Sequence, residues 1–329
     1  MNTQELIKSF SELEIAVLGD LMMDEYVWGD AARVSPESPV LVIDVKRESA
    51  VPGGAANVAA NIMALGAKAR IFGAVGSDAK GKDLIRTLEE RGADTAGIVL
   101  DPSRPTTRKT RVVAQNQQVL RVDRESTEPI SQELSQELLQ RLQATMGSMS
   151  AILVSDYAKG IVNSDLLPGA IEFARTKQKP VIANGKPENA RLFRGAHILS
   201  LNLQEAIATS GDKRFKTEDI RDAGAKLREV LDVETLVVTR GPKGICAWSK
   251  SGDHIDVPAH SVEVYDVAGA GDTVISVLTL ATAAGATPEQ AARLAVIAAA
   301  IVVGKVGVAT VTADELLHHF SEFHEPTSH

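Results

Sequence analysis

The segment Ile15-Ala-Val-Leu-Gly19-Asp20 is a short apolar run that ends on a carboxylate. Similar runs recur along the chain at residues 70–75, 151–154, 181–183, 198–201 and 236–239. Runs of this length that are apolar throughout, rather than alternating, are typical of buried strands in a parallel sheet. These runs therefore predict the central sheet of the protein.

Stretches of helical length lie between and after these strands. They span residues 57–65, 80–91, 131–146, 164–177, 217–231, 271–284 and 288–303. Several begin with residues that favour a helix start, such as Ser131 followed by Glu133, and Thr217 followed by Glu218. Because strand and helix alternate, the sequence predicts an α/β fold, with a doubly wound, mainly parallel sheet flanked by helices.

Two segments interrupt this alternation. Residues 26–52 contain the strand-like VLVIDVK at 40–46, and residues 104–125 contain alternating runs on either side of Asn116 that predict a hairpin. A small sheet built from these two insertions would lie over one edge of the body as a lid. We therefore expect a single domain over residues 1–329 that carries the lid segments within it.

Composition limits the class of protein. The chain has 329 residues, of which 44% are hydrophobic and 24% charged, as in ordinary globular proteins. A net charge of −8 argues against nucleic acid or an anionic membrane as a partner, and a single cysteine excludes an intramolecular disulfide. The N-terminus lacks a signal-peptide pattern, and the longest apolar run, 294–303, is too short to span a bilayer. We expect a cytoplasmic protein.

The sharpest chemical signal is Asp266-Val-Ala-Gly269-Ala270-Gly271-Asp272 at the start of an apolar helix. Small residues let the N–H groups of a helix N-terminus approach an anion, which the helix dipole also favours. A carboxylate in that first turn can take a proton from an attacking hydroxyl while the backbone stabilises the transferred group. A lone motif of this kind is more often an ordinary helix start, so other motifs must support it.

Two further motifs open predicted helices. Gly53-Gly54-Ala-Ala-Asn57 can bring backbone beside a ligand and an amide to a sugar hydroxyl, although a plain turn would have the same glycines. Asn202-Leu-Gln-Glu205 follows the strand at 198–201, at the edge where ligands bind in open α/β folds. Glu205 could hold a hydrated Mg²⁺ there, and a helix cap is an equally good interpretation of the pair.

Together these motifs resemble those of the ribokinase-like (PfkB) carbohydrate kinases, in the family's order, from residue 15 to about 311. The resemblance implies that Asp272 is the catalytic base and that Gly269, Ala270 and Gly271 form the anion hole. It implies Mg·ATP at Asn202, Glu205, Thr239, Gly241 and Gly244, and the sugar at Asp20, Gly53, Gly54 and Asn57. In some relatives the residue that corresponds to Asp266 helps to coordinate a monovalent cation, which implies K⁺.

Within the family, several stretches look like one branch, the D-glycero-D-manno-heptose 7-phosphate kinases of lipopolysaccharide assembly. These stretches are GDLMMDEYVWGD at 19–30, RVSPESPV at 33–40, SDYAKG at 155–160 and DVAGAGDTV at 266–274. The resemblance implies ATP-dependent phosphorylation of the C1 hydroxyl to the 1,7-bisphosphate, on the route to ADP-heptose. Some members also carry a nucleotidyltransferase; none follows here before His329, so we expect the kinase step alone.

One departure from the pattern is Asn184-Gly185-Lys186, where many relatives carry Asp-Pro-Lys. It leaves the role of position 184 undetermined.

A phosphorylated sugar needs cationic partners away from the transfer site. Six cationic residues fall within 104–124, and the candidates for the distal phosphate are Arg33, Arg111, Lys159 and Lys186. A solvated hairpin face would carry similar charges. Because two small β insertions leave open edges, which the family often covers by pairing two lids, we also expect a homodimer.

Two other functions remain open at this stage. One is a kinase of the same family for another sugar, such as a fructose phosphate or a ketodeoxy sugar acid. The other is a non-catalytic sensor of sugar phosphates or nucleotides, against which the intact Asp272 argues. A nicotinamide-dependent dehydrogenase is remote, because the first βα turn lacks the GxGxxG pattern.

Overall fold

A computed structural model describes residues 2–115, 117–216 and 220–324. Within these residues a nine-stranded sheet has the order β13-β12-β11-β10-β9-β8-β1-β4-β5. Its strands are β1 (Glu14–Gly19), β4 (Lys68–Gly76), β5 (Asp94–Asp101), β8 (Ala151–Ser155), β9 (Val181–Asn184), β10 (Ile198–Asn202), β11 (Thr235–Thr239), β12 (Ile245–Ser249) and β13 (His254–Val257). From β11 to β5 all neighbours are parallel, whereas β12 and β13 are antiparallel.

The predicted apolar runs form the six central strands from β11 to β4, which confirms the doubly wound fold. The segment GICAW at 244–248, strand-like in the sequence, forms most of β12, whereas the two strands at the sheet's ends, β5 and β13, were not predicted. Their sequences, such as DTAGIVLD in β5 and HIDV in β13, mix polar and apolar residues because these strands lie toward the edges. The apolar-run criterion therefore finds the middle of the sheet and misses its margins.

The helices follow the predicted spans closely. They are α2 (Ala55–Ala64), α3 (Ala79–Glu90), α4 (Gln132–Thr145), α5 (Leu167–Thr176), α7 (Ile220–Leu231), α8 (Ala270–Ala283) and α9 (Pro288–Val303). The predicted helix start at Thr217 and Glu218 lies outside the described residues.

Shorter or more polar helices were not predicted. They are α1 (Thr3–Lys8), α6 (Leu203–Ser210) and α10 (Ala313–His324), with 3₁₀ turns η1 (Ser9–Glu12), η2 (Ala190–Phe193), η3 (Lys213–Lys216) and η4 (Gly241–Lys243). Among the helices described, none is both long and apolar enough to cross a membrane.

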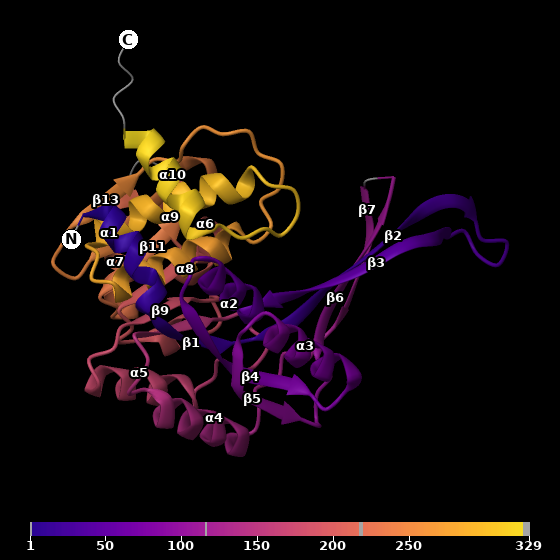
Figure 1. Cartoon of the computed structure of the whole chain (residues 1–329), viewed down its shortest axis with the longest axis horizontal. Coiled ribbons are helices and arrows are strands. Elements are labelled where there is room, and N and C mark those ends of the chain that lie inside the picture. The colour runs from indigo at the N-terminus through magenta and orange to yellow at the C-terminus, as the bar shows by residue number, and fades with distance from the viewer. Residues whose placement is uncertain (1, 116, 217–219, 325–329) are drawn as a thin grey trace, which may run out of the picture.

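Helices cover both faces of the large sheet (Figure 1). In β1, Ile15 and Val17 pack into one core with α2, α8 and α9, while Ala16 and Leu18 pack into a second core with α4, α5 and α7. This alternation follows from the two-residue period of a strand. It explains why the strand is apolar throughout: both of its faces are buried.

A second, four-stranded sheet extends away from this body (Figure 1). We call it the lid sheet; its order is β3-β2-β6-β7, with β2 (Leu21–Val34), β3 (Leu41–Gly54), β6 (Thr107–Ala114) and β7 (Gln117–Arg124). The hairpin of β2 and β3 begins at residue 21, earlier than the predicted 26, because Leu21, Met22 and Met23 are buried at its base. The turn residue Asn116 lies outside the described residues.

Candidate active site

The carboxyl ends of five adjacent parallel strands meet at one edge of the large sheet. They bring Asp20 after β1, Tyr157 after β8, Asn184 in β9, Asn202 in β10 and Thr239 in β11 to the same side. A cavity of about 170 Å³ opens there, and its lining includes Tyr157, Asn184, Lys186, Asn202, Glu205, Thr239, Gly269, Gly271 and Asp272. Residues from five separate segments therefore share one pocket, at the position where open α/β sheets bind ligands.

Asp272 lies in the first turn of α8 with its side chain buried. One carboxylate oxygen, Oδ2, accepts a hydrogen bond of 2.7 Å from Asn57 Nδ2, and Oδ1 accepts one of 2.6 Å from the Tyr157 hydroxyl. Burial raises the pKa of Asp272, and these two hydrogen bonds oppose the rise. Such an environment suits a carboxylate that must accept a proton.

The N-terminus of α8 forms the floor of the pocket beside Asp272. Gly269 caps the helix in a left-handed conformation with φ 82°, and both Gly269 and Gly271 line the cavity. The first-turn N–H groups of a helix have no acceptor within it, so they can bind an anion. The structure thus places a buried carboxylate next to a helix N-terminus that could bind an anion.

Asn202 and Glu205 form a capping box at the start of α6. Asn202 Oδ1 accepts from the Glu205 amide at 2.9 Å, and Glu205 Oε2 accepts from the Asn202 amide at 2.7 Å. The cap predicted as one interpretation is present, and the same two side chains also line the cavity. The other carboxylate oxygen of Glu205 pairs with the Lys186 ammonium.

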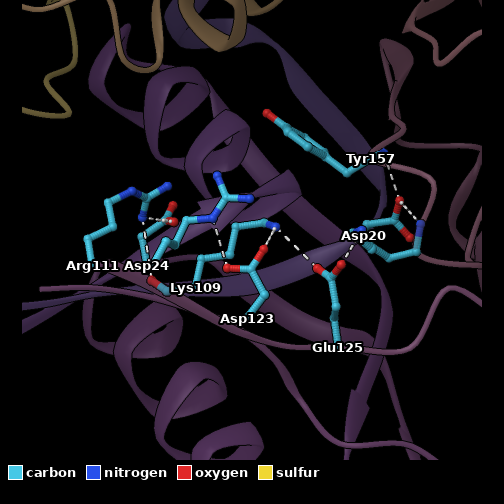
Figure 2. Close-up of polar contacts among 9 residues, drawn as sticks. Asp20, Asp24, Lys109, Arg111, Asp123, Glu125 and Tyr157 are labelled. Atoms are coloured by element: carbon cyan, nitrogen blue, oxygen red, sulfur yellow. Dashed lines mark hydrogen bonds and ion pairs between the residues drawn. The ribbon is translucent and has the colours of Figure 1, made fainter. Parts of the chain in front are cut away.

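Asp20 is buried, accepts hydrogen bonds from backbone amides and is not among the residues that line the cavity. Its Oδ2 accepts from the amides of Tyr157 and Lys159 at 2.7 and 3.1 Å, and its Oδ1 accepts from the Ile161 amide at 3.1 Å (Figure 2). Burial raises the pKa of Asp20, although these amides oppose the rise. Asp20 therefore fastens the 157–161 loop to the end of β1.

A neighbouring carboxylate, Asp156, does the same for the segment after β9. It accepts from the amides of Ala158 and Lys186 at 2.8 and 2.9 Å and from the Asn189 side chain. Burial, with the nearby charge of Asp20, raises the pKa of Asp156 to about 6. Asn184, at the position that departs from the family pattern, lines the cavity, and its Oδ1 accepts from the Asp156 amide.

The paired glycines make room for Asp24. A Cβ on Gly53 would lie 2.2 Å from Asp24 Oδ2, so any side chain there would displace this carboxylate. Gly54 caps α2 with φ 59°, in the left-handed region that favours glycine. Asp24 also contributes to the raised pKa of Asp272, which places it near the base. Sequence reasoning missed Asp24, although it is the second carboxylate of the quoted GDLMMDEY segment.

The cationic residues of the lid are already paired with carboxylates. Arg111 donates to Asp24 at 2.5 Å, Lys109 pairs with Asp123 and Glu125 at 3.2 and 3.1 Å, and Lys159 pairs with Glu125 at 2.7 Å (Figure 2). These pairs form a network over the base of the lid sheet, close to Tyr157. A phosphate that binds these cations would therefore compete with the carboxylates that now pair with them.

Not every predicted site residue reaches this pocket. Arg33 is exposed near the far end of β2, about 30 Å beyond Asp24 at a strand rise of 3.3 Å per residue. Of the predicted nucleotide residues, Thr239 lines the cavity, whereas Gly241 and Gly244 lie in the following turn outside its lining. Asp266 accepts from the Ala268 amide at 2.9 Å, in the loop before α8.

A comparison with protein families finds that a profile described as "pfkB family carbohydrate kinase" matches residues 12–315. Among curated proteins, the chain is 42% identical over 316 residues to the bifunctional protein HldE of Geobacter sulfurreducens, and 42% identical over 306 residues to that of Helicobacter hepaticus. These alignments cover 96% and 93% of this chain. The chain spans 64% and 63% of the length of those proteins.

Solved structures share the fold. Ribokinase from Arabidopsis thaliana, in complex with ribose and ATP, superposes with a TM-score of 0.74 at 21% identity, over 93% of this chain and 97% of that one. Phosphofructokinase-2 from Escherichia coli, in complex with fructose-6-phosphate, gives 0.77 at 18% identity, over 94% and 98%. The architecture is therefore shared well beyond the range of recognisable sequence similarity.

Proposed function

Because the chain belongs to the pfkB family of carbohydrate kinases, we propose that it transfers the γ-phosphoryl group of ATP to the C1 hydroxyl of D-glycero-D-manno-heptose 7-phosphate. The observation that carries the transfer chemistry is Asp272, buried beside the N-terminus of α8 in a cavity shared with Asn202, Glu205 and Thr239. The choice of sugar rests on the four sequence stretches that look like heptose 7-phosphate kinases. It is supported by the 42% identity to HldE proteins.

In this mechanism Asp272 takes the proton of the C1 hydroxyl as its oxygen attacks the γ-phosphorus. The bond from that phosphorus to the β-phosphate oxygen breaks, and ADP leaves. The amides at Gly269 to Gly271 stabilise the charge on the migrating group, so that positioning and electrostatics supply most of the acceleration. The products are ADP and the 1,7-bisphosphate.

Magnesium fits the donor set of the pocket as an ion brought by ATP. Within the described part of the chain no group of three or more His, Cys, Asp or Glu side chains could hold a metal. Mg²⁺ commonly binds through substrate phosphates, waters and one or two carboxylates, and Glu205 lines the cavity to hold one of those waters. The ion would neutralise charge on the ATP phosphates. A monovalent cation at Asp266 stays a prediction.

We propose that the distal 7-phosphate binds at the base of the lid, where Arg111, Lys109 and Lys159 lie. Arg111 is the first candidate, because its guanidinium lies at the base of the lid sheet, where it pairs with Asp24 beside the paired glycines. An arriving phosphate would replace the carboxylates on these cations with a doubly charged group that matches the guanidinium fork. Lys186 instead pairs with Glu205, which lies on the nucleotide side in our proposal.

Because these cations already form ion pairs with carboxylates, an alternative function is also favoured. A kinase for a neutral sugar would need no exchange of partners, and the ion pairs would then be purely structural. ADP release measured across a panel of sugars and sugar phosphates separates the two functions. Turnover restricted to heptose 7-phosphate supports our proposal, and turnover of an unphosphorylated sugar at least as fast contradicts it.

We further propose that two copies pair through their lid sheets. The lid exposes large apolar side chains that a lone sheet would leave in water: Val34, Val40, Leu41, Val45, Val119, Leu120 and Val122. On β7, Leu120 and Val122 lie on one face, since they are two residues apart. The same apolar face on a second copy of this chain could cover these side chains, because both faces are apolar and a two-fold dimer buries the same surface on each copy.

Light scattering should therefore give the mass of a dimer at micromolar concentration. The double substitution Leu120→Asp and Val122→Asp should weaken dimerisation by about 10²–10⁴-fold, because each of the two buried side chains contributes about 1.5–3 kcal/mol. Val230→Asp, at an apolar residue that is equally exposed on α7, is the matched control and should leave the mass unchanged. A wild-type monomer with full activity would contradict this assembly.

A further inference from the structure

We propose that Tyr157 is a positioning residue for Asp272, holding one oxygen of its carboxylate while the other is held by Asn57. The inference rests on the proposed function, which makes Asp272 the base. The family resemblance assigned Tyr157 no role, and its ring lies 115 residues away from Asp272 in sequence.

The contact geometry carries the proposal. The Tyr157 hydroxyl donates to Oδ1 at 2.6 Å and Asn57 Nδ2 donates to Oδ2 at 2.7 Å, so each oxygen receives one neutral donor. Two donors from separate elements fix the plane of the carboxylate. Each oxygen keeps a second lone pair, which leaves the group able to accept a proton from a sugar hydroxyl.

The loop that carries Tyr157 is itself held firmly. Asp20 accepts three of its amides, and the contact with Tyr157 is drawn in Figure 2. Asp156 accepts the amide of Ala158. Ala158 has φ 53°, a conformation that costs free energy for a residue with a Cβ and persists where surrounding contacts impose it. The hydrogen bonds to Asp20 and Asp156 hold the loop in this conformation and so fix the position of the Tyr157 hydroxyl. Asp20, expected to hold the sugar, also holds this loop.

The groups facing the pair come from several elements. Asp24 on β2 and Glu205 on α6 add negative charge, and Lys186 after β9 lies with its ammonium 5.5 Å from the centroid of the Tyr157 ring. Burial first, and then the charge of Asp272, raise the pKa of Tyr157 well above its ordinary value. The phenol therefore stays protonated and donates throughout the neutral range.

The first test is the pH profile of kcat/KM for Tyr157→Phe. Because the hydroxyl stabilises the charged form of Asp272, its loss should move the acidic limb to higher pH by about one unit, the scale of a hydrogen bond to a charged group. Tyr265→Phe makes the same change at a side chain that is 59% exposed, and it should keep the wild-type profile. Since all variants share the titrations of the substrates, a separation of the curves reports a group of the protein near Tyr157, and the Asp272→Asn background below assigns it. An unmoved limb would overturn the proposal.

The second test needs no substrate. The folded-state pKa of Asp272 is raised, so the stability it contributes is greatest at low pH and is lost as the pH rises through that pKa. In Tyr157→Phe the folded-state pKa of Asp272 should be higher still, so the stability that Asp272 contributes keeps falling up to a higher pH. The cost of Tyr157→Phe in urea unfolding should thus be larger above the folded-state pKa of Asp272 than below it, by about tenfold in the folding equilibrium constant.

In an Asp272→Asn background the cost of Tyr157→Phe in urea unfolding should no longer increase with pH. A cost that does not change with pH, or that changes equally in that background, would overturn the proposal. If the wild type released no ADP with any sugar, the proposed function would fail, and the urea measurement would still decide whether Tyr157 holds Asp272.

Discussion

Asp272→Asn should lower kcat by about 10²–10⁴-fold, the range expected for loss of a general base. The amide keeps the volume of the carboxylate and can still accept from the Tyr157 hydroxyl, so the pocket should persist. It cannot take the proton of the attacking C1 hydroxyl. ATP should bind nearly as before, since the groups proposed for the nucleotide, such as Thr239 and Asn202, are unchanged.

Single-turnover phosphoryl transfer, with ATP binding followed by calorimetry, separates these two effects. Asp222→Asn, the same change on the exposed surface of α7, is the matched control and should retain wild-type turnover. A folded Asp272→Asn variant with near-wild-type kcat would show that another group takes the proton.

Removal of the distal phosphate from the substrate should lower kcat/KM by about 10³-fold, because its binding energy with the lid cations is lost. Both kcat and KM should change, since binding energy from the far end of the substrate orients the reacting hydroxyl. Arg111→Ala should cost about 10²-fold with heptose 7-phosphate and little with heptose. The reason is that Arg111, in our proposal, contacts the distal phosphate, which heptose lacks.

The control for this series is Arg86→Ala, on the exposed face of α3, which should leave both sugars unaffected. Equal kcat/KM for the two sugars in the wild type would refute the phosphate site and favour a neutral substrate. Discrimination that survives Arg111→Ala would move the site to Lys109 and Lys159.

The central fold was predictable because buried parallel strands have a distinctive sequence. The run at 15–19 is apolar on both faces, and the structure shows Ile15 and Leu18 in opposite cores. The motifs that indicate a PfkB kinase were likewise local, and the match of the family profile over residues 12–315 confirms that identification. In contrast, β13 at the edge carries polar residues such as His254 and Asp256, which hide it from an apolar-run criterion.

The details of the site were less predictable, because they depend on contacts between distant segments. Asp20 and Asn57 were expected to hold the sugar, yet one holds the 157–161 loop and the other donates to Asp272. Tyr157 lies in the quoted SDYAKG segment, but nothing in the local sequence shows that its hydroxyl meets the base. Arg33 was grouped with the lid cations by charge, and only the length of the hairpin shows how far away it lies.

The most direct test of the account is the position of the phosphate in the product, followed by phosphorus NMR during incubation with Mg·ATP and D-glycero-D-manno-heptose 7-phosphate. We predict a second sugar phosphate resonance, coupled to the anomeric proton, that grows in step with ADP while the C7 phosphate resonance persists. New phosphate on any other carbon, or ADP release without a new sugar phosphate, would contradict it.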